Sequence, residues 1–302
     1  MSSLRVVGGK KLEGDVTLRG SKNAASKLMV ASLLTDESCT ITNVPFSVET
    51  DITRELCEQI GSAVVREGNH EMRIKTPMIK TSVVPELSRK NRIPILALGP
   101  LIHRNGFAEV PVLGGCPIGH RPINFHLEAL NQMGITIERR AHSYYAEAAS
   151  IHGAVISFPY PSVGATENVL LTAVLADGRT TIANAAVEPE IMNLIAMLRA
   201  MGATIAADTH ARHIIIDGVK KLSGASVAVI PDRNEAVSFA AAALATDGDI
   251  FIRDITEDHL TAFLVALKRI GASHDIQKTG RIGLVGTHRF AGHNFFKHSI
   301  NS

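Results

Sequence analysis

The residue types best suited to chemistry gather in one short loop, LGGCPIGHRP, at residues 113–122. Cys116 lies there among three glycines and two prolines, with His120 and Arg121 close by. Neighbouring cations favour the thiolate and make such a cysteine reactive. Most free cysteines instead behave as small buried hydrophobic residues. We favour reactivity at Cys116, because a glycine-rich cationic loop is a poor place to bury a thiol.

The other two cysteines have a different setting. Cys39 falls in an expected strand and Cys57 in an expected apolar helix, so both are predicted to be buried. Three widely spaced cysteines do not make a disulfide framework. The N-terminal residues have no apolar core of the signal-peptide type, and no stretch of about 18 apolar residues is long enough to cross a membrane. A reducing cytoplasm is therefore the expected location.

Two segments could bind anions through a helix N-terminus. GSKNAA (20–25) opens a helix, so its free N–H groups and Lys22 could hold a phosphate or carboxylate, with Asn23 as a further donor and acceptor. SVGATEN (162–168) places Ser162 and Gly164 just ahead of a second helix. By residue pattern alone the first signal is weak and the second segment is structural.

A third segment, NAAVEPEI (184–191), places Glu188 and Glu190 around Pro189 at the start of a helix. Glutamate in a first helical turn usually complements the helix dipole. The pattern alone therefore indicates a structural role for both glutamates.

Composition excludes several classes of protein. The formal net charge is +2 and only 4% of residues are aromatic, so neither a basic surface nor stacking platforms for nucleic acid are expected. With 45% hydrophobic residues and no long low-complexity tract, the composition predicts a folded rather than a disordered chain.

The elements that must position these residues follow a repeat. Gly61, Gly134, Gly202 and Gly271 end similar segments, separated by 73, 68 and 69 residues. Each repeat reads as an apolar helix (23–34 or 235–244), a strand (180–184), an amphipathic helix, the glycine, and two strands (203–208 and 213–217). In the fourth repeat the amphipathic helix has one apolar face, because its apolar residues recur at steps of three and four: Leu260, Phe263, Leu264, Leu267 and Ile270.

The glycine fits a helix C-cap in the left-handed conformation. Each repeat is thus a βαβαββ-like block, and several blocks packed around their helices would share a core. After residue 287 the pattern stops. His288, His293 and His298 share no helix face and have no supporting Cys or carboxylate, so we predict no metal site and no cofactor.

Together, LRGSKNAA, GGCPIGHRP, PSVGATEN, NAAVEPEI and PDRNEA (231–236) resemble UDP-N-acetylglucosamine enolpyruvyl transferases from about residue 4 to residue 286. The resemblance implies an α/β fold, the inside-out α/β barrel, in which each domain holds three βαβαββ units around buried helices. It implies a complete first barrel at 20–229 that carries the Cys loop. Residues 1–19 and 230–302 would then form a shortened second barrel with one repeat of three.

The same resemblance implies transfer of the enolpyruvyl group of phosphoenolpyruvate to the 3-hydroxyl of UDP-N-acetylglucosamine, the first committed step of peptidoglycan synthesis. Cys116 matches the catalytic cysteine of the mobile loop, as covalent nucleophile and general acid. The implied substrate-binding residues are Lys22, Asn23, Arg92, Arg121, Pro122, Ser162, Val163 and Gly164. Small-molecule substrates are implied, and neither nucleic acid nor membrane.

The sequence also departs from the family pattern. Asn124 stands where many relatives have Asp, and Val187 replaces a common Arg. Four repeats are present where the family has six, and the segment that carries the aspartate base of the family is not among them. Three hypotheses therefore stay open: the transferase in a shortened form, a non-catalytic UDP-sugar-binding relative, and an interaction module.

Overall fold

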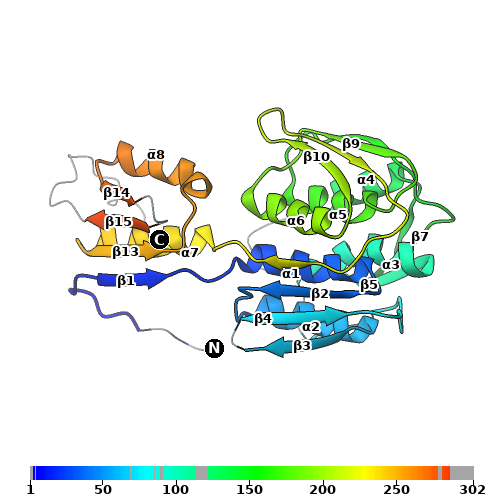
Figure 1. Cartoon of the computed structure of the whole chain (residues 1–302), viewed down its shortest axis with the longest axis horizontal. Helices are drawn as coiled ribbons and strands as arrows, with labels where there is room; N and C mark the ends of the chain where they lie inside the picture. The colour runs from blue at the N-terminus through cyan, green and yellow to red at the C-terminus, as the bar shows by residue number, and fades with distance from the viewer. Residues whose placement is uncertain are drawn as a thin grey trace. The chain divides into compact units, whose positions relative to one another are not determined.

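The computed structural model describes residues 3, 5–68, 70–84, 86–88, 91–112, 114, 122–277 and 281–285, with the backbone alone for 273–277 and 281–285. The chain divides into two compact units. The larger unit is Gly20–Ile230, and the smaller unit combines Met1–Arg19 with Pro231–Ser302 (Figure 1). Each unit is described by itself.

The larger unit contains three copies of one pattern of elements, an apolar helix, a strand, a second helix and two strands. The first copy is α1 (Lys22–Ala31), the 3-10 turn η1 (Ser32–Leu34), β2 (Ser38–Thr42), α2 (Val48–Ile60), β3 (Ala63–Glu67) and β4 (Glu71–Lys75). The second is η2 (Ile93–Ala97), α3 (Leu98–Asn105), β5 (Phe107–Pro111), α4 (Asn124–Gln132), β6 (Thr136–Arg139) and β7 (Ser143–Glu147). The third is α5 (Val163–Ala173), β9 (Arg179–Ala183), α6 (Pro189–Ala200), β10 (Thr204–Asp208) and β11 (His213–Asp217).

Each copy builds its own sheet in the same order. The last strand of the copy pairs antiparallel with both other strands, so β4 lies between β2 and β3, β7 between β5 and β6, and β11 between β9 and β10. A parallel neighbour then joins the first strand of each sheet. This neighbour is β12 (Ser226–Ala228) for β2 and β8 (Val155–Ser157) for β9, while β5 has a single parallel bridge between Val83 and Glu109. The α/β fold expected from the repeats is confirmed.

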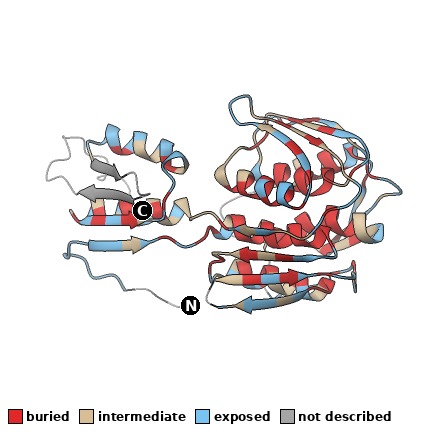
Figure 2. Cartoon of the chain, in the orientation of Figure 1, coloured by how far each residue is buried: buried red, intermediate tan, exposed pale blue. Residues whose placement is uncertain are grey.

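The first helix of each copy is buried among the sheets, as the red helices of the larger unit in Figure 2 show. In α5, nine of eleven residues are buried, and in α1 seven of ten. An apolar surface on all sides lets such helices pack against one another. At the crossing of α3 and α5 the backbone comes so close that a Cβ on Gly99 would lie 2.1 Å from Thr172 Oγ1.

The smaller unit contains one further copy of the pattern. It comprises α7 (Arg233–Ala245), β13 (Asp249–Arg253), η3 (Glu257–Leu260), α8 (Thr261–Arg269), β14 (Ser273–Gln277) and β15 (Arg281–Val285), and β1 (Glu13–Thr17) supplies the parallel neighbour of β13. Its core is small, and only Ala236, Ala240 and Ala243 of α7 are buried. Leu260 and Leu267 are buried, whereas Ile270 follows the end of α8 and is exposed.

The glycines that end the second helices follow the sequence closely. Gly61, Gly134, Gly202 and Gly271 all have positive φ, from 75° to 123°, after the second helix of their copies, which confirms the predicted left-handed glycine. The edge strands, in contrast, are exchanged: β1 precedes α1 in the chain but pairs with β13, whereas β12 precedes α7 but pairs with β2. Each of these two edge strands thus lies in the chain next to the first helix of one unit but pairs in the sheet of the other unit.

The two structural cysteines lie where the sequence predicts. Cys39 in β2 and Cys57 in α2 are buried and free. Burial, together with a smaller effect of the Glu58 charge, raises the pKa of Cys57 to about 12. Neither thiol is set up for reaction. Among the helices of the described residues, none has the length and apolar character needed to cross a membrane.

Candidate functional site

The N-terminus of α1 presents unpaired donors beside a lysine. Ser21 is the N-cap residue, and its carbonyl accepts from the N–H groups of Ala24 and Ala25. No described residue accepts from the N–H groups of Lys22 and Asn23, and the Lys22 side chain is exposed. Two free N–H groups, the positive end of the helix dipole and an ammonium group together suit a phosphate or carboxylate.

The N-terminus of α5 offers a second pair of donors. Ser162 caps the helix, because its hydroxyl accepts from the Ala165 N–H at 3.4 Å and its carbonyl from the Thr166 N–H. Within the described residues, the N–H groups of Val163 and Gly164 have no acceptor. The turn Ser162–Gly164 is therefore a second place where an anion can bind the larger unit.

Three separate segments converge on this turn. Arg92, the residue before η2, donates through Nη2 to the carbonyl of Pro122 at 3.4 Å. His126 in α4 lies so close to Gly164 that a Cβ there would be 3.1 Å from the ring atoms Cε1 and Nε2. The guanidinium of Arg92 also acts on His126 through its charge. Arg92, Pro122, His126 and the Ser162–Gly164 turn thus form one cationic, donor-rich group.

His126 is the residue of this group that the sequence prediction missed. The ring is buried, and burial together with the charge of Arg92 lowers its pKa to about 4. The Asn168 amide Nδ2 donates to His126 Nδ1 at 3.2 Å, so the ring is neutral and carries its proton on Nε2, the edge against Gly164. A His four residues after Pro122, on the same helix start, was the only signal available in the sequence.

Three glutamate side chains lie near the Ser162–Gly164 turn. Glu188 is the N-cap residue of α6 and Glu190 lies in its first turn, as predicted. Glu167 of α5 is buried near both, and burial raises its pKa to about 7. The structural interpretation of the glutamates is therefore incomplete, because they share a buried region with a third carboxyl group.

No set of three or more His, Cys, Asp or Glu in the described part of the chain is placed to hold a metal ion.

The predicted site residues fall into three groups according to where they lie. It gathers Arg92, Pro122 and the Ser162–Gly164 turn, and it puts Lys22 and Asn23 at the start of another helix of the same unit. Cys116 and Arg121 lie outside the described residues, as do the three C-terminal histidines.

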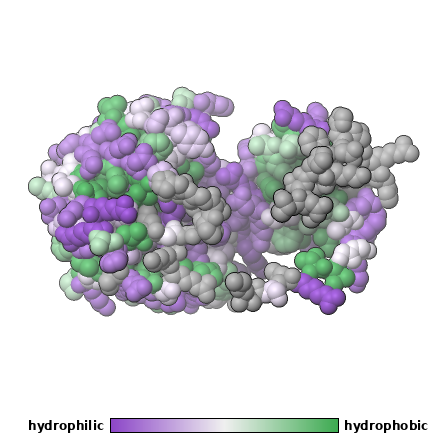
Figure 3. All heavy atoms as spheres, turned by 180° about the vertical axis from the view of Figure 1, so that it is seen from behind, coloured by the Kyte–Doolittle hydropathy of each residue, from purple (hydrophilic) through white to green (hydrophobic). Residues whose placement is uncertain are grey.

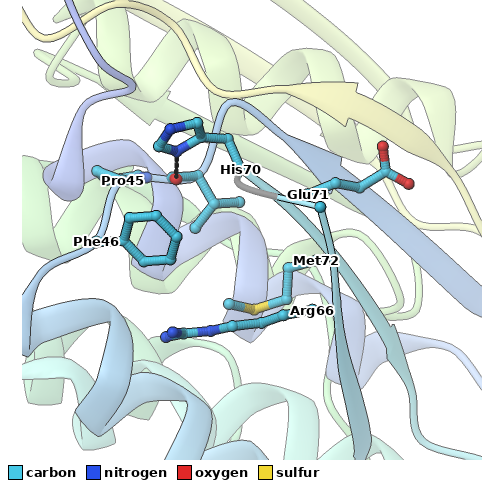
Figure 4. A pocket seen from close by; sticks show the side chains of 8 residues that line it. Pro45, Phe46, Arg66, His70, Glu71 and Met72 are labelled. Atoms are coloured by element: carbon cyan, nitrogen blue, oxygen red, sulfur yellow. Dashed lines mark hydrogen bonds between the residues drawn. The ribbon is translucent and has the colours of Figure 1, made fainter.

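A small surface pocket lies elsewhere in the larger unit, at the ends of β3 and β4 (Figure 4). Its empty volume is about 220 Å³ counted out to open solvent. The Phe46 ring lies between the Arg66 guanidinium, 5.3 Å from its centroid, and the His70 ring at 5.1 Å. His70 Nδ1 is 3.0 Å from the Val44 carbonyl. None of the predicted site residues lines this pocket.

Comparison with known proteins defines the class. The family model of EPSP synthase (3-phosphoshikimate 1-carboxyvinyltransferase) matches residues 6–294, so the chain belongs to the EPSP synthase family. Among solved structures, the enolpyruvyl transferase NikO from Streptomyces tendae has a TM-score of 0.81 at 20% identity, over 93% of this chain and 67% of that one. At that identity the likeness establishes the fold, which agrees with the expectation from the repeats.

Relatives of higher identity narrow the resemblance. The UDP-N-acetylglucosamine 1-carboxyvinyltransferase of Protochlamydia amoebophila is 42% identical over 288 residues, 93% of this chain and 62% of the relative. The Chlamydia abortus protein of the same name is 44% identical over 285 residues, 93% of this chain and 64% of the relative. The chain therefore spans less than two thirds of the length of these relatives.

Proposed function

We propose that the chain transfers the enolpyruvyl group of phosphoenolpyruvate to the 3-hydroxyl of UDP-N-acetylglucosamine, with release of phosphate. The proposal rests on one observation above all: a chain 42–44% identical to enzymes named for this reaction gathers Arg92 and His126 around the free N–H groups of the Ser162–Gly164 turn. This reaction is the first committed step of peptidoglycan synthesis. We assign it to the cytoplasm.

The nucleotide sugar binds at the α5 turn. Its diphosphate accepts from the N–H groups of Val163 and Gly164 and from the His126 Nε2–H, and Arg92 supplies the countercharge. Pro122 and Arg121 lie next in the chain to α4 and contact the uridine. This arrangement uses the N–H groups of Val163 and Gly164, for which no described residue is an acceptor.

Phosphoenolpyruvate binds at the α1 turn. Its phosphate and carboxylate are both anionic, and Lys22 with the N–H groups of Lys22 and Asn23 gives them a charge and directed donors. The sugar 3-hydroxyl adds to C2 of phosphoenolpyruvate and gives its proton to a base, and a second proton is delivered to C3. Cys116 is the acid at C3. Loss of a proton from C3 then expels phosphate and restores the double bond.

The decisive experiment measures phosphate release with both substrates. We expect turnover that requires both and that falls by at least about a hundredfold in Cys116→Ala, the scale of one general acid–base group. Calorimetric titration with UDP-N-acetylglucosamine measures binding separately.

Binding without turnover would favour the non-catalytic UDP-sugar-binding relative. Neither binding nor turnover would leave the interaction module. Because the described residues between 231 and 285 form one copy of the repeated pattern where the larger unit holds three, we also infer that residues 1–19 and 230–302 belong to a second barrel with one repeat of three.

A further inference from the structure

Three consecutive polar residues are buried on α5, next to the anion-binding turn. Thr166, Glu167 and Asn168 are at most 3% exposed on a helix whose other residues are apolar except for Thr172. Thr166 Oγ1 accepts from the Ala186 N–H at 3.1 Å, and Asn168 donates to His126. The two outer members of the triplet thus tie the helix to the α6 loop and to α4.

Glu167, the middle member, differs from both. None of the described residues donates a hydrogen bond to its carboxyl group, although the residue is only 3% exposed. A buried carboxylate without donors is costly, and the group avoids that cost by binding a proton. Burial is accordingly the main reason why its pKa is raised to about 7.

The charges that face Glu167 come from three other helices. Lys27 of α1 lowers its pKa, whereas Glu190 and Glu188 at the start of α6, and Glu49 of α2, raise it. Lys27 is shared, since its Nζ lies 3.8 Å from Glu49 Oε1, and Glu188 Oε2 is buried without a hydrogen-bond partner. Three carboxyl groups and one ammonium group thus act on Glu167 through their charges.

The remaining elements packed against α5 add no charge that acts on the Glu167 carboxyl group. His126 of α4 faces Asn168 instead, with Arg92 beside it, and His103 of α3 bonds the Thr172 carbonyl at 2.7 Å. Neither ring acts on the Glu167 carboxyl group, and β9 and β11 present no charged group to it.

The position of Glu167 relates it to the turn. It lies three residues after Gly164 and four after Val163, so it stands on the same helix face about one turn, roughly 5 Å, further along. An ionised Glu167 would repel an anion held by the N–H groups of those two residues, in a region where burial weakens screening.

We propose that Glu167 is a proton-linked positioning residue for the anion-binding turn: the turn holds its anionic ligand when Glu167 carries a proton. The inference rests on the proposed function, since the ligand is the diphosphate of the nucleotide sugar. Binding then takes up a proton from solvent, carboxylate plus H⁺ giving the neutral acid. By reciprocity, a rise in pH that removes this proton weakens binding.

The test compares the affinity of the wild-type chain and Glu167→Gln for UDP-N-acetylglucosamine from pH 6 to 8.5, by calorimetry. The probe is suitable because both of its phosphoryl groups are diesters, so its charge is constant in this range. The wild-type affinity should fall with rising pH by about fivefold or more, a typical coupling between sites. Glu167→Gln is permanently neutral, so its affinity should stay level at the low-pH value. At pH 7 the wild type should also take up protons on binding, measured in buffers of different ionisation enthalpy, and Glu167→Gln should take up fewer.

Glu138→Gln is the matched control, since Glu138 is an exposed residue of β6 paired with Arg140. It should keep the wild-type pH profile. Equal pH profiles in wild type and Glu167→Gln, with both binding, would overturn this inference and leave the proposed function standing. If the wild-type chain binds no UDP-N-acetylglucosamine at any pH, the proposed function fails and this inference with it. If Glu167→Gln misfolds, Glu167→Asp keeps a titratable group and should retain a pH-dependent affinity, while a level profile in that variant would contradict the proposal.

Discussion

At the scale of single residues, polar side chains of the larger unit, several of them buried, gather around one helix end. Ser162 caps α5, Thr166 and Asn168 tie it to its neighbours, and Glu167 contributes a carboxyl group that titrates near neutrality. Each side chain costs free energy to bury unless it is paired or neutral. The concentration of such groups beside the Val163 and Gly164 N–H groups indicates that the geometry of this turn is specified closely.

Glu167 makes the stability of the protein depend on pH. Its pKa is raised in the folded chain to about 7, above the ordinary glutamate value of about 4.3 in the unfolded chain. The folded state therefore binds more protons between these values, and stability falls as pH rises from about 4 to about 7. Glu167→Gln removes this loss and should be more stable than wild type above pH 7, by on the order of 3 kcal/mol, with a difference that vanishes near pH 4. Urea unfolding at a series of pH values measures it, and two curves that stay parallel would refute the assignment.

The close approach of His126 to Gly164 predicts a binding defect. In Gly164→Ala the new Cβ would lie 3.1 Å from the His126 ring, so the ring or the turn must shift. We expect the affinity for UDP-N-acetylglucosamine to fall about tenfold or more, because the N–H groups of the turn lose their alignment. Calorimetry provides the measurement. Gly8→Ala is the control, since a Cβ there meets nothing within 4 Å, and an equal loss in that variant would exclude the steric explanation.

At the scale of elements, α3 and α5 cross this closely because residue 99 is a glycine and has no side chain. A Cβ on Gly99 would lie 2.1 Å from Thr172 Oγ1, so Gly99→Ala should lower the free energy of unfolding by about 1–3 kcal/mol, the range for overpacking in a core. Denaturant unfolding measures the change.

A second substitution separates this clash from other effects of the mutation. Thr172→Ala removes the hydroxyl group that the new Cβ would meet, so Gly99→Ala combined with Thr172→Ala should be more stable than Gly99→Ala alone. Additive losses in the double variant would show that the two residues do not interact.

The elements were largely predictable from sequence, and their partners were not. Repeated glycines, apolar helices and β-branched strands follow local rules, so the order of elements and the left-handed glycines could be read directly. The exchange of β1 and β12 could not, because a three-residue strand carries little signal and its partner lies far away in the chain. Likewise, the role of Glu167 depends on charges from α1, α2 and α6, which only the folded chain brings together.

At the scale of the whole molecule, the two units differ in how well they cover their helices. In α5 nine of eleven residues are buried, whereas α7 buries three of thirteen and leaves Phe239 exposed. Figure 3 shows hydrophobic residues at the surface of the smaller unit, and Phe251, Val265 and Ile270 are among its exposed residues. Less apolar burial per residue gives less stability.

This difference predicts unequal local stability. Amide hydrogens of α7 and β13 should exchange faster than those of α5 and β9, by at least about a hundredfold, since exchange from a region with few buried contacts needs only local opening. Hydrogen-exchange mass spectrometry on the full chain provides the comparison. Equal protection in the two units would show that they unfold as one cooperative body.

The exchange of edge strands has a consequence for synthesis on the ribosome. Glu13–Thr17 is synthesised long before the strand that it must join, Asp249–Arg253. Until that strand is made, the N–H and C=O groups of Glu13–Thr17 remain without their native neighbours, while the larger unit can already assemble once Ser226–Ala228 has been made. Nascent chains stalled before residue 249 should therefore expose the N-terminal segment to proteases and chaperones.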